Sequence, residues 1–134
     1  MATMIKFRAW YMPFGKYGAM QEMVYSRASH ILALAETEPE KYIPEQFTGL
    51  TDKQGVEIYN GDILHFGSIW CVGDEYDPRE EEHIGLVEYR PDYASYVVNC
   101  NGKIYPLEQV ISFDGYSVHG NAHENPELLE ERDD

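Results

Sequence analysis

Apolar and polar residues alternate along several short segments of the chain, at the two-residue period of β-strands. In the first third, this pattern predicts strands at Lys6–Tyr11, Met20–Tyr25 and Ile43–Leu50, with the first two antiparallel. Between the second and third strands, the spacing becomes helical, and Ser26 is expected to cap the helix. The apolar positions of that short helix are Ala28, Ile31, Leu32 and Ala35.

The remainder of the chain is typical of a succession of short strands joined by tight turns. Gly67-Ser68 and Asn101-Gly102 are predicted to form two-residue hairpin turns. Gly73–His83 is predicted to be an acidic loop, and Glu127–Glu131 a short helix that Asn125-Pro126 opens. The strands are expected at Ile63–Phe66, Ile69–Val72, Ile84–Tyr89, Ser95–Cys100, Lys103–Tyr105, Val110–Phe113 and Tyr116–Gly120.

Such strands favour a mainly β, α+β fold with a small antiparallel barrel or meander. We expect a smaller α+β region at residues 1–50 and the barrel, with an acidic tail, at 51–134. A Val97→Asp substitution is expected to unfold the barrel, because it would bury an unpaired charge. The expected barrel core is Ile63, Phe66, Ile69, Val72, Leu86, Val87, Tyr89, Val97, Ile104, Val110 and Val118.

Turn residues are concentrated between the two regions. In Asp52-Lys53-Gln54-Gly55, the aspartate side chain can accept a hydrogen bond from a backbone N–H two residues further on. Gly55 can take the positive φ that such a turn needs. Asn60-Gly61 is a strong hairpin signal, and Asp62 can bond back to the turn backbone. We interpret these residues as folding residues rather than as a binding loop.

Composition and charge narrow the choice of function. The 134 residues suffice for a core without disulfides, and their 43% hydrophobic content is that of a globular protein. Of the 24 acidic residues, 12 lie in two segments, 74–82 and 124–134. The net charge of −14 argues against direct binding to nucleic acid, which needs lysine and arginine to displace counterions. No apolar run is long enough for a membrane span.

Several motifs together resemble the YopX family of phage and prophage proteins. The central one is "FTGLTDKQGVEIYNGDIL", which runs from Phe47 to Leu64. Ile5–Trp10 resembles the opening of the family and His119–Leu129 its "GNxxENPELL" ending. The resemblance implies an SH3-like barrel with an α+β region before it and a short C-terminal helix. The family has no established biochemical activity, so it supplies no site residues.

No group of residues is a convincing catalytic or metal site. His119 and His123 have a metal-like separation beside Glu124, but the sequence indicates no third or fourth ligand for zinc. Glu80, Glu81 and Glu82 with His83 could hold a divalent cation weakly, although a solvated loop accounts for them better. Cys71 and Cys100 are expected to be reduced, buried and inert. We therefore predict no cofactor, no metal and no enzymatic activity.

The sequence favours a phage or prophage accessory protein that acts through protein–protein contacts and self-assembly. We expect a homo-oligomer, with a host or phage protein as a further partner, in the cytoplasm of the host bacterial cell. Eleven tyrosines and open strand edges favour such contacts. The alternative is an acidic nucleic-acid mimic that inhibits a host DNA-binding protein.

Overall fold

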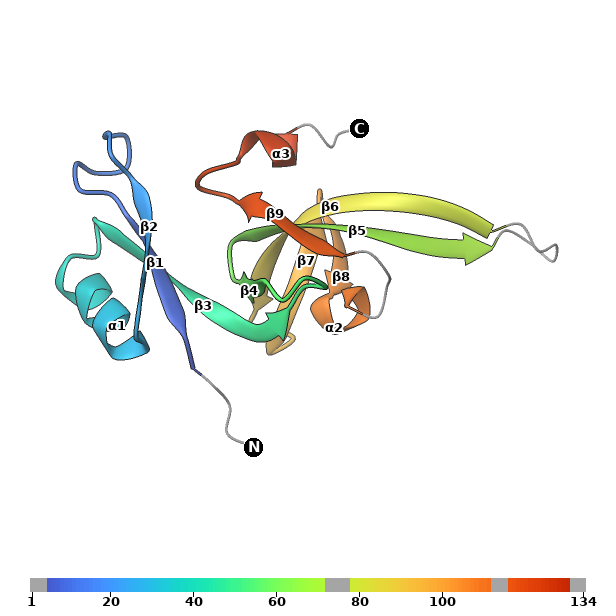
Figure 1. Ribbon diagram of the computed structural model, residues 1–134, viewed down its shortest axis with the longest axis horizontal. Helices are drawn as coiled ribbons and strands as arrows, with labels where there is room; N and C mark the ends of the chain where they lie inside the picture. Colours follow the sequence, from blue (N-terminus) through green and yellow to red (C-terminus); the bar gives the residue numbers. More distant parts are fainter. Residues whose placement is uncertain (1–4, 72–77, 112–115, 131–134) are drawn as a thin grey trace. The chain divides into compact units, whose positions relative to one another are not determined.

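The protein is mainly β and divides into two compact units, Met1–Leu50 and Thr51–Asp134 (Figure 1). The structure is a computed structural model and describes residues 5–71, 78–111 and 116–130. We describe each unit by itself and call them unit 1 and unit 2. Within the described ranges, no helix combines the length and the apolar character that crossing a membrane requires.

Unit 1 is an antiparallel sheet with one helix. Strand β1 (Phe7–Tyr11) lies between β2 (Glu22–Ser26) and β3 (Tyr42–Thr51). Helix α1 (Ala28–Thr37) packs against β1 and β2. The buried apolar side chains are Ala9, Trp10, Met12 and Ile31. The three predicted strands, the helix and the antiparallel pairing of the first two strands are confirmed.

The predicted cap of this helix is wrong. Arg27 occupies the N-cap position of α1 and makes no side-chain capping hydrogen bond. The hydroxyl of Ser26 lies 2.9 Å from Nδ1 of His30 instead. Ser26 is the last residue of β2, so it precedes the N-cap position by one residue.

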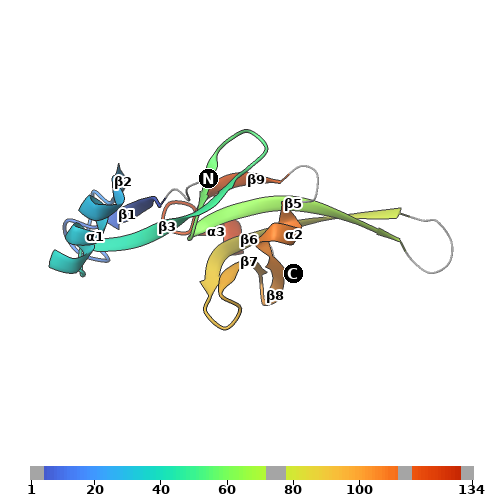
Figure 2. The same cartoon turned by 90° about the horizontal axis from the view of Figure 1, so that it is seen from below.

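Unit 2 contains a five-stranded antiparallel sheet that curls into a half-barrel (Figure 2). Its strand order is β8-β7-β6-β5-β9. The short strand β4 (Glu57–Tyr59) precedes it. Helices α2 (Leu107–Val110) and α3 (Glu127–Glu130) complete the unit. The five strands are β5 (Asp62–Cys71), β6 (Pro78–Arg90), β7 (Ser95–Cys100), β8 (Lys103–Pro106) and β9 (Ser117–Asn121).

The core of unit 2 agrees in part with the predicted one. Five of the predicted core residues are buried, namely Ile63, Phe66, Val87, Val97 and Val110. Leu86, Ile104 and Val118 are only half-buried, and Tyr89 is exposed. Ile69 and Val72 fall outside the described side chains. Leu64, Val98 and Leu107 are buried without having been predicted.

Two sequence assignments in unit 2 are wrong because strand pairing overrides local signals. Gly67-Ser68 is not a turn, since β5 continues through it and pairs with Glu82 and Glu81 of β6. The predicted acidic loop is also shorter than expected, because β6 begins at Pro78 and includes Glu80, Glu81 and Glu82. Residues 72–77 lie outside the described ranges.

The outer parts of β5 and β6 therefore form a two-stranded ribbon (Figure 1). Strand β9 pairs with β5 only at Asp62–His65, and β7 pairs with β6 only at Leu86–Arg90.

Another correction concerns Val110, which was expected to begin a strand and instead ends α2. Ile111, the next residue of that predicted strand, is the C-cap of α2, and residues 112–113, its remainder, are not among those described.

Candidate functional site

The first polar group with a defined role is the carboxylate of Asp52, which is buried in unit 2. Its Oδ1 accepts hydrogen bonds from the backbone N–H groups of Gln54 and Val56, at 2.8 and 2.9 Å. Gly55 takes a φ of +86°, so the predicted turn is confirmed. Its Oδ2 accepts from the N–H of Val118, 66 residues away, at 3.0 Å.

These donors set the proton affinity of Asp52. Burial acts to raise the pKa of this carboxyl, but the backbone N–H groups of Val118, Val56, Gln54 and Gly55 outweigh it and lower the pKa. A charged carboxylate that accepts several backbone hydrogen bonds is stabilised in its ionised form. The fold therefore stabilises the ionised form of the Asp52 carboxyl.

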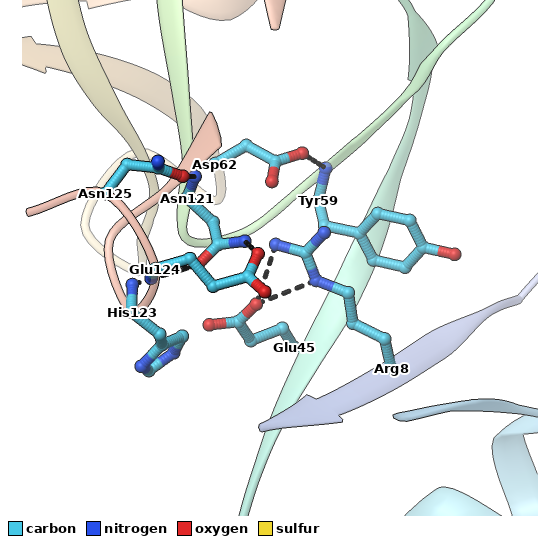
Figure 3. A network of polar contacts seen from close by, with 8 residues as sticks. All are labelled: Arg8, Glu45, Tyr59, Asp62, Asn121, His123, Glu124 and Asn125. Carbon is cyan, nitrogen blue, oxygen red and sulfur yellow. Dashed lines mark hydrogen bonds and ion pairs between the residues drawn. The ribbon is translucent and has the colours of Figure 1, made fainter. Parts of the chain in front are cut away.

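Asp62 and Asn121 lie opposite each other in the pairing of β5 with β9 (Figure 3). Oδ2 of Asp62 accepts a hydrogen bond of 2.8 Å from the N–H of Tyr59, which confirms the predicted bond back to the turn. Gly61 has a φ of +96°, and its carbonyl oxygen accepts a hydrogen bond of 2.9 Å from the N–H of Ala122. The turn joins β4 to β5, but β4 is not in the sheet of β5, so the predicted hairpin is wrong.

The segment after β9 is held by Asn121 (Figure 3). Its Oδ1 accepts from the N–H groups of His123 and Glu124, at 3.0 and 2.9 Å. Its Nδ2 donates a hydrogen bond of 2.8 Å to Oε1 of Glu124. The backbone N–H of Asn121 donates a hydrogen bond to Oδ1 of Asn125. A Cβ at Gly120 would lie 2.3 Å from that same Oδ1, so only glycine fits there. Asp52 and Asp62 of the central motif and Asn121 of the C-terminal motif therefore bind backbone groups of neighbouring segments.

His119 and His123, whose spacing in the sequence resembled that of a metal site, lie with different partners in the structure. The ring of His119 stacks on that of His65, with centroids 4.9 Å apart and an interplanar angle of 15°. Nε2 of His65 lies 2.6 Å from Oε1 of Glu82. His123 belongs to the turn that Asn121 organises. Within the described ranges, no group of three His, Cys, Asp or Glu residues is placed to hold a metal ion.

A cavity of about 450 Å³ lies beside these histidines in unit 2. His83 lies at its wall and packs on the rings of Phe66 and Tyr105. Cys100 also lines it and is partly exposed, whereas the sequence predicted a buried thiol. No pattern along the chain indicates this cavity, because strand register brings its residues together. The lining residues are His65, Glu82, His83, Ile84, Cys100, Asn101 and Leu128.

Unit 1 contains a buried ion pair between neighbouring strands (Figure 3). Arg8 on β1 lies opposite Glu45 on β3, and both are almost fully buried. Nε and Nη2 of the guanidinium each lie 2.8 Å from Oε1 of the carboxylate. Breaking such a buried pair by removing one partner is strongly destabilising, because the remaining buried charge loses its counter-charge. No local pattern in the sequence indicates this pair, because its partners lie 37 positions apart.

The loop between β1 and β2 is ordered by one side chain, that of Gln21. Its Oε1 accepts a hydrogen bond of 2.8 Å from the indole N–H of the buried Trp10. Its Nε2 donates to the carbonyl oxygens of Lys16 and Gly18, at 2.9 and 3.0 Å. It also donates to the carbonyl oxygen of Gly15 at 3.4 Å, so one amide group ties three loop carbonyls to the core of unit 1.

The same loop carries large apolar side chains in solvent. Phe14 is 69% exposed, Tyr17 92% and Met20 76%. Met20 also has a φ of +65°, a conformation that is unfavourable for a residue with a side chain. Because Gln21 binds backbone carbonyls of this loop, the three side chains are carried on an ordered backbone. We refer to Phe14, Tyr17 and Met20 as the loop cluster.

Comparison with known proteins identifies a family and a shared fold. Comparison with curated proteins gave no match. Among solved structures, the chain is similar to the crystal structure of protein EF1440 from Enterococcus faecalis, with 24% identity and a TM-score of 0.53. That match covers 96% of this chain and 99% of the other, and it shows a shared fold. The family model described as YopX protein matches residues 6–130, so the chain belongs to the YopX family.

Proposed function

We propose that this protein is a non-enzymatic phage or prophage accessory protein that acts through protein–protein contacts and self-assembly in the host cytoplasm. The observation that carries the proposal is the loop cluster. Exposed apolar side chains on a soluble surface are typical of interaction sites when they are grouped. A rigid backbone beneath them lowers the conformational entropy that binding would cost.

The polar motif residues support a non-enzymatic role. The side chains of Asp52, Asp62 and Asn121 all accept hydrogen bonds from backbone N–H groups. Catalytic acids, bases and nucleophiles need to face a site where a substrate can reach them. These three side chains are buried and serve the turns that connect the strands.

The experiment is an affinity pull-down from infected and uninfected host cells with purified protein as bait. A variant with Phe14→Ser, Tyr17→Ser and Met20→Ser is compared with the parent. Tyr93→Ser is the matched control, since Tyr93 is 58% exposed and lies in the turn after β6, in unit 2. We expect the loop variant to lose a captured partner that the control keeps.

Capture of the same proteins in equal amounts by the loop variant would contradict the role of the loop cluster. Circular dichroism melts of all three proteins show whether a loss of binding follows from unfolding. The exposed positions of the substitutions make unchanged melting the expected result.

A second candidate is the acidic mimic of nucleic acid, which the distribution of charge favours. Residues 51–134 carry 19 acidic and 5 basic residues, whereas residues 1–50 carry 5 of each. Glu80, Glu81 and Glu82 stand on β6, so their backbone spacing is that of a strand. Regularly spaced carboxylates could engage a basic protein surface electrostatically.

A further inference from the structure

Asparagine is followed by glycine at two places in unit 2, Asn60-Gly61 and Asn101-Gly102. An asparagine in this setting is chemically labile, because the backbone nitrogen of the next residue can attack the carbon of its side-chain amide. Glycine leaves that nitrogen accessible, since it has no Cβ to shield it. The two sites share one chemistry, so the structure around each decides how readily the reaction occurs.

The peptide group of Gly61 is held by backbone on both sides. Its N–H donates a hydrogen bond of 2.8 Å to the carbonyl oxygen of Val87, which is fully buried on β6. Its carbonyl oxygen accepts a hydrogen bond of 2.9 Å from the N–H of Ala122. Asn60 itself is half-buried. Moving the Gly61 nitrogen toward the Asn60 side chain would break the contacts that join this turn to β6 and to the segment after β9.

The turn at Asn101-Gly102 is held less tightly. Both residues are exposed, and they form the whole connection between β7 and β8. Their φ angles of 57° and 97° are those of a type I′ hairpin turn. The N–H of Gly102 donates a hydrogen bond of 2.7 Å to the side-chain oxygen of Asn99, which is itself half-buried rather than part of the core.

The side chain of Asn101 makes no hydrogen bond, ion pair or ring contact with any other residue that the structure describes. Its amide group can therefore turn toward the Gly102 nitrogen without losing a partner in that part of the chain. Exposed turns also open locally at little cost in free energy, whereas segments bonded to the core open rarely. Asn101 should therefore reach a reactive geometry more often than Asn60.

We propose that Asn101 is a site of spontaneous deamidation, which Asn60 resists. The Gly102 nitrogen, after losing its proton to hydroxide, attacks Cγ of Asn101. The new C–N bond closes a succinimide ring, and the side-chain nitrogen takes a proton from water and leaves as ammonia. Water then opens the ring at either carbonyl carbon, which gives aspartate or isoaspartate. This inference goes beyond the proposed function and does not rest on it.

Deamidation would alter the cavity and the hairpin of unit 2. Asn101 and Glu82 both line the cavity, so an aspartate at position 101 adds a second carboxylate to its wall. Isoaspartate also inserts a methylene group into the backbone of the turn that joins the paired residues Cys100 and Lys103. Both products thus change the charge of the cavity, and isoaspartate changes the geometry of the hairpin as well.

Peptide mapping by mass spectrometry tests the proposal on the purified, folded chain. The protein is incubated at neutral and at mildly alkaline pH, and each asparagine is then assayed for conversion to aspartate and isoaspartate. We expect Asn101 to react about tenfold faster than Asn60, because its turn opens more readily. The rate at Asn101 should rise with pH, since hydroxide removes the proton from the attacking nitrogen.

Two controls isolate the contribution of the fold. In guanidinium chloride, where the chain is unfolded, Asn60 and Asn101 should react at similar rates. An Asn101→Gly variant keeps a residue that accepts positive φ but lacks the amide, so the modification at this position should disappear. Thermal melts show that this variant is folded.

The outcomes decide the proposal in either direction. Faster reaction at Asn101 in the folded chain, together with equal rates in the unfolded chain, supports it. A folded chain in which Asn101 stays intact, or reacts no faster than Asn60, overturns it.

Discussion

The indole N–H of Trp10 donates a 2.8 Å hydrogen bond to the side-chain carbonyl of Gln21, eleven residues further along the chain. Trp10 is a core residue of unit 1, and the same Gln21 side chain binds the loop carbonyls of Lys16 and Gly18. The relationship thus couples the core directly to the loop that carries the exposed apolar side chains. A loop ordered in this way can bind a partner without first having to fold.

Replacing Gln21 with alanine is expected to destabilise the protein by about 1–3 kcal/mol, because the buried indole N–H loses its acceptor. Urea unfolding followed by tryptophan fluorescence measures the change. Gln21→Glu is the control, since glutamate keeps the acceptor for Trp10 but removes the donors to the loop. If the alanine variant unfolds at the same urea concentration as the parent, Gln21 does not order the loop.

The stability of unit 2 is expected to depend on the charge of Asp52. Its pKa is lowered in the folded protein relative to the ordinary value of 3.8, so its ionised form stabilises the fold. This contribution is complete above the pKa of the unfolded chain and is lost as the pH falls through the lower, folded pKa. In Asp52→Asn it should be absent, and the loss of stability as the pH falls below the ordinary pKa of 3.8 should be smaller than in the parent.

Thermal melts of both proteins at steps of pH measure this difference. Asparagine keeps one acceptor oxygen, but its amide would oppose the N–H of Val118, so the variant should also be less stable at pH 7. Identical pH profiles for the two proteins would contradict the role of the Asp52 carboxylate.

Val97 tests the assignment of the core in unit 2. It is 1% exposed on β7, so aspartate at this position would be a charge without a partner in an apolar environment. We expect Val97→Asp to abolish the cooperative transition of unit 2. Val97→Ala is the milder comparison and should cost about 1–3 kcal/mol. Thermal stability equal to that of the parent in the aspartate variant would count against the assignment.

The acidic residues should matter for a partner more than for folding. A variant with Glu80, Glu81, Glu82, Glu130 and Glu131 changed to glutamine is expected to melt near the parent temperature. Its binding to any basic partner found by pull-down should be weaker and less sensitive to salt, because screening acts on charges that have been removed. Undiminished binding with the same salt dependence would remove the main support for nucleic-acid mimicry.

Local rules correctly predicted two turns of this chain. Asp52–Gly55 and Asn101-Gly102 depend on residues within the turn itself, and Asn101 and Gly102 indeed have positive φ angles of 57° and 97°. The strands of unit 1 were also predictable, because alternation is visible along each one. The SH3-like form of the barrel stays a prediction.

What could not be predicted depends on partners distant in the sequence. Gly67 and Ser68 have turn composition, yet they are held extended by pairing with β6. The hydrogen bond from Val118 to Asp52 and the ion pair of Arg8 with Glu45 join residues 66 and 37 positions apart. The histidine-lined cavity arises in the same way, from the register of β5, β6 and β7.

The molecular mass in solution tests the central claim, self-assembly through protein–protein contacts, most directly. Sedimentation of the purified chain at micromolar concentrations, at physiological salt, measures it without labels or partners. If the chain self-assembles, we expect a species of at least twice the 15.5 kDa chain mass, with a proportion that rises with concentration. A single 15.5 kDa species across the whole concentration range would contradict it.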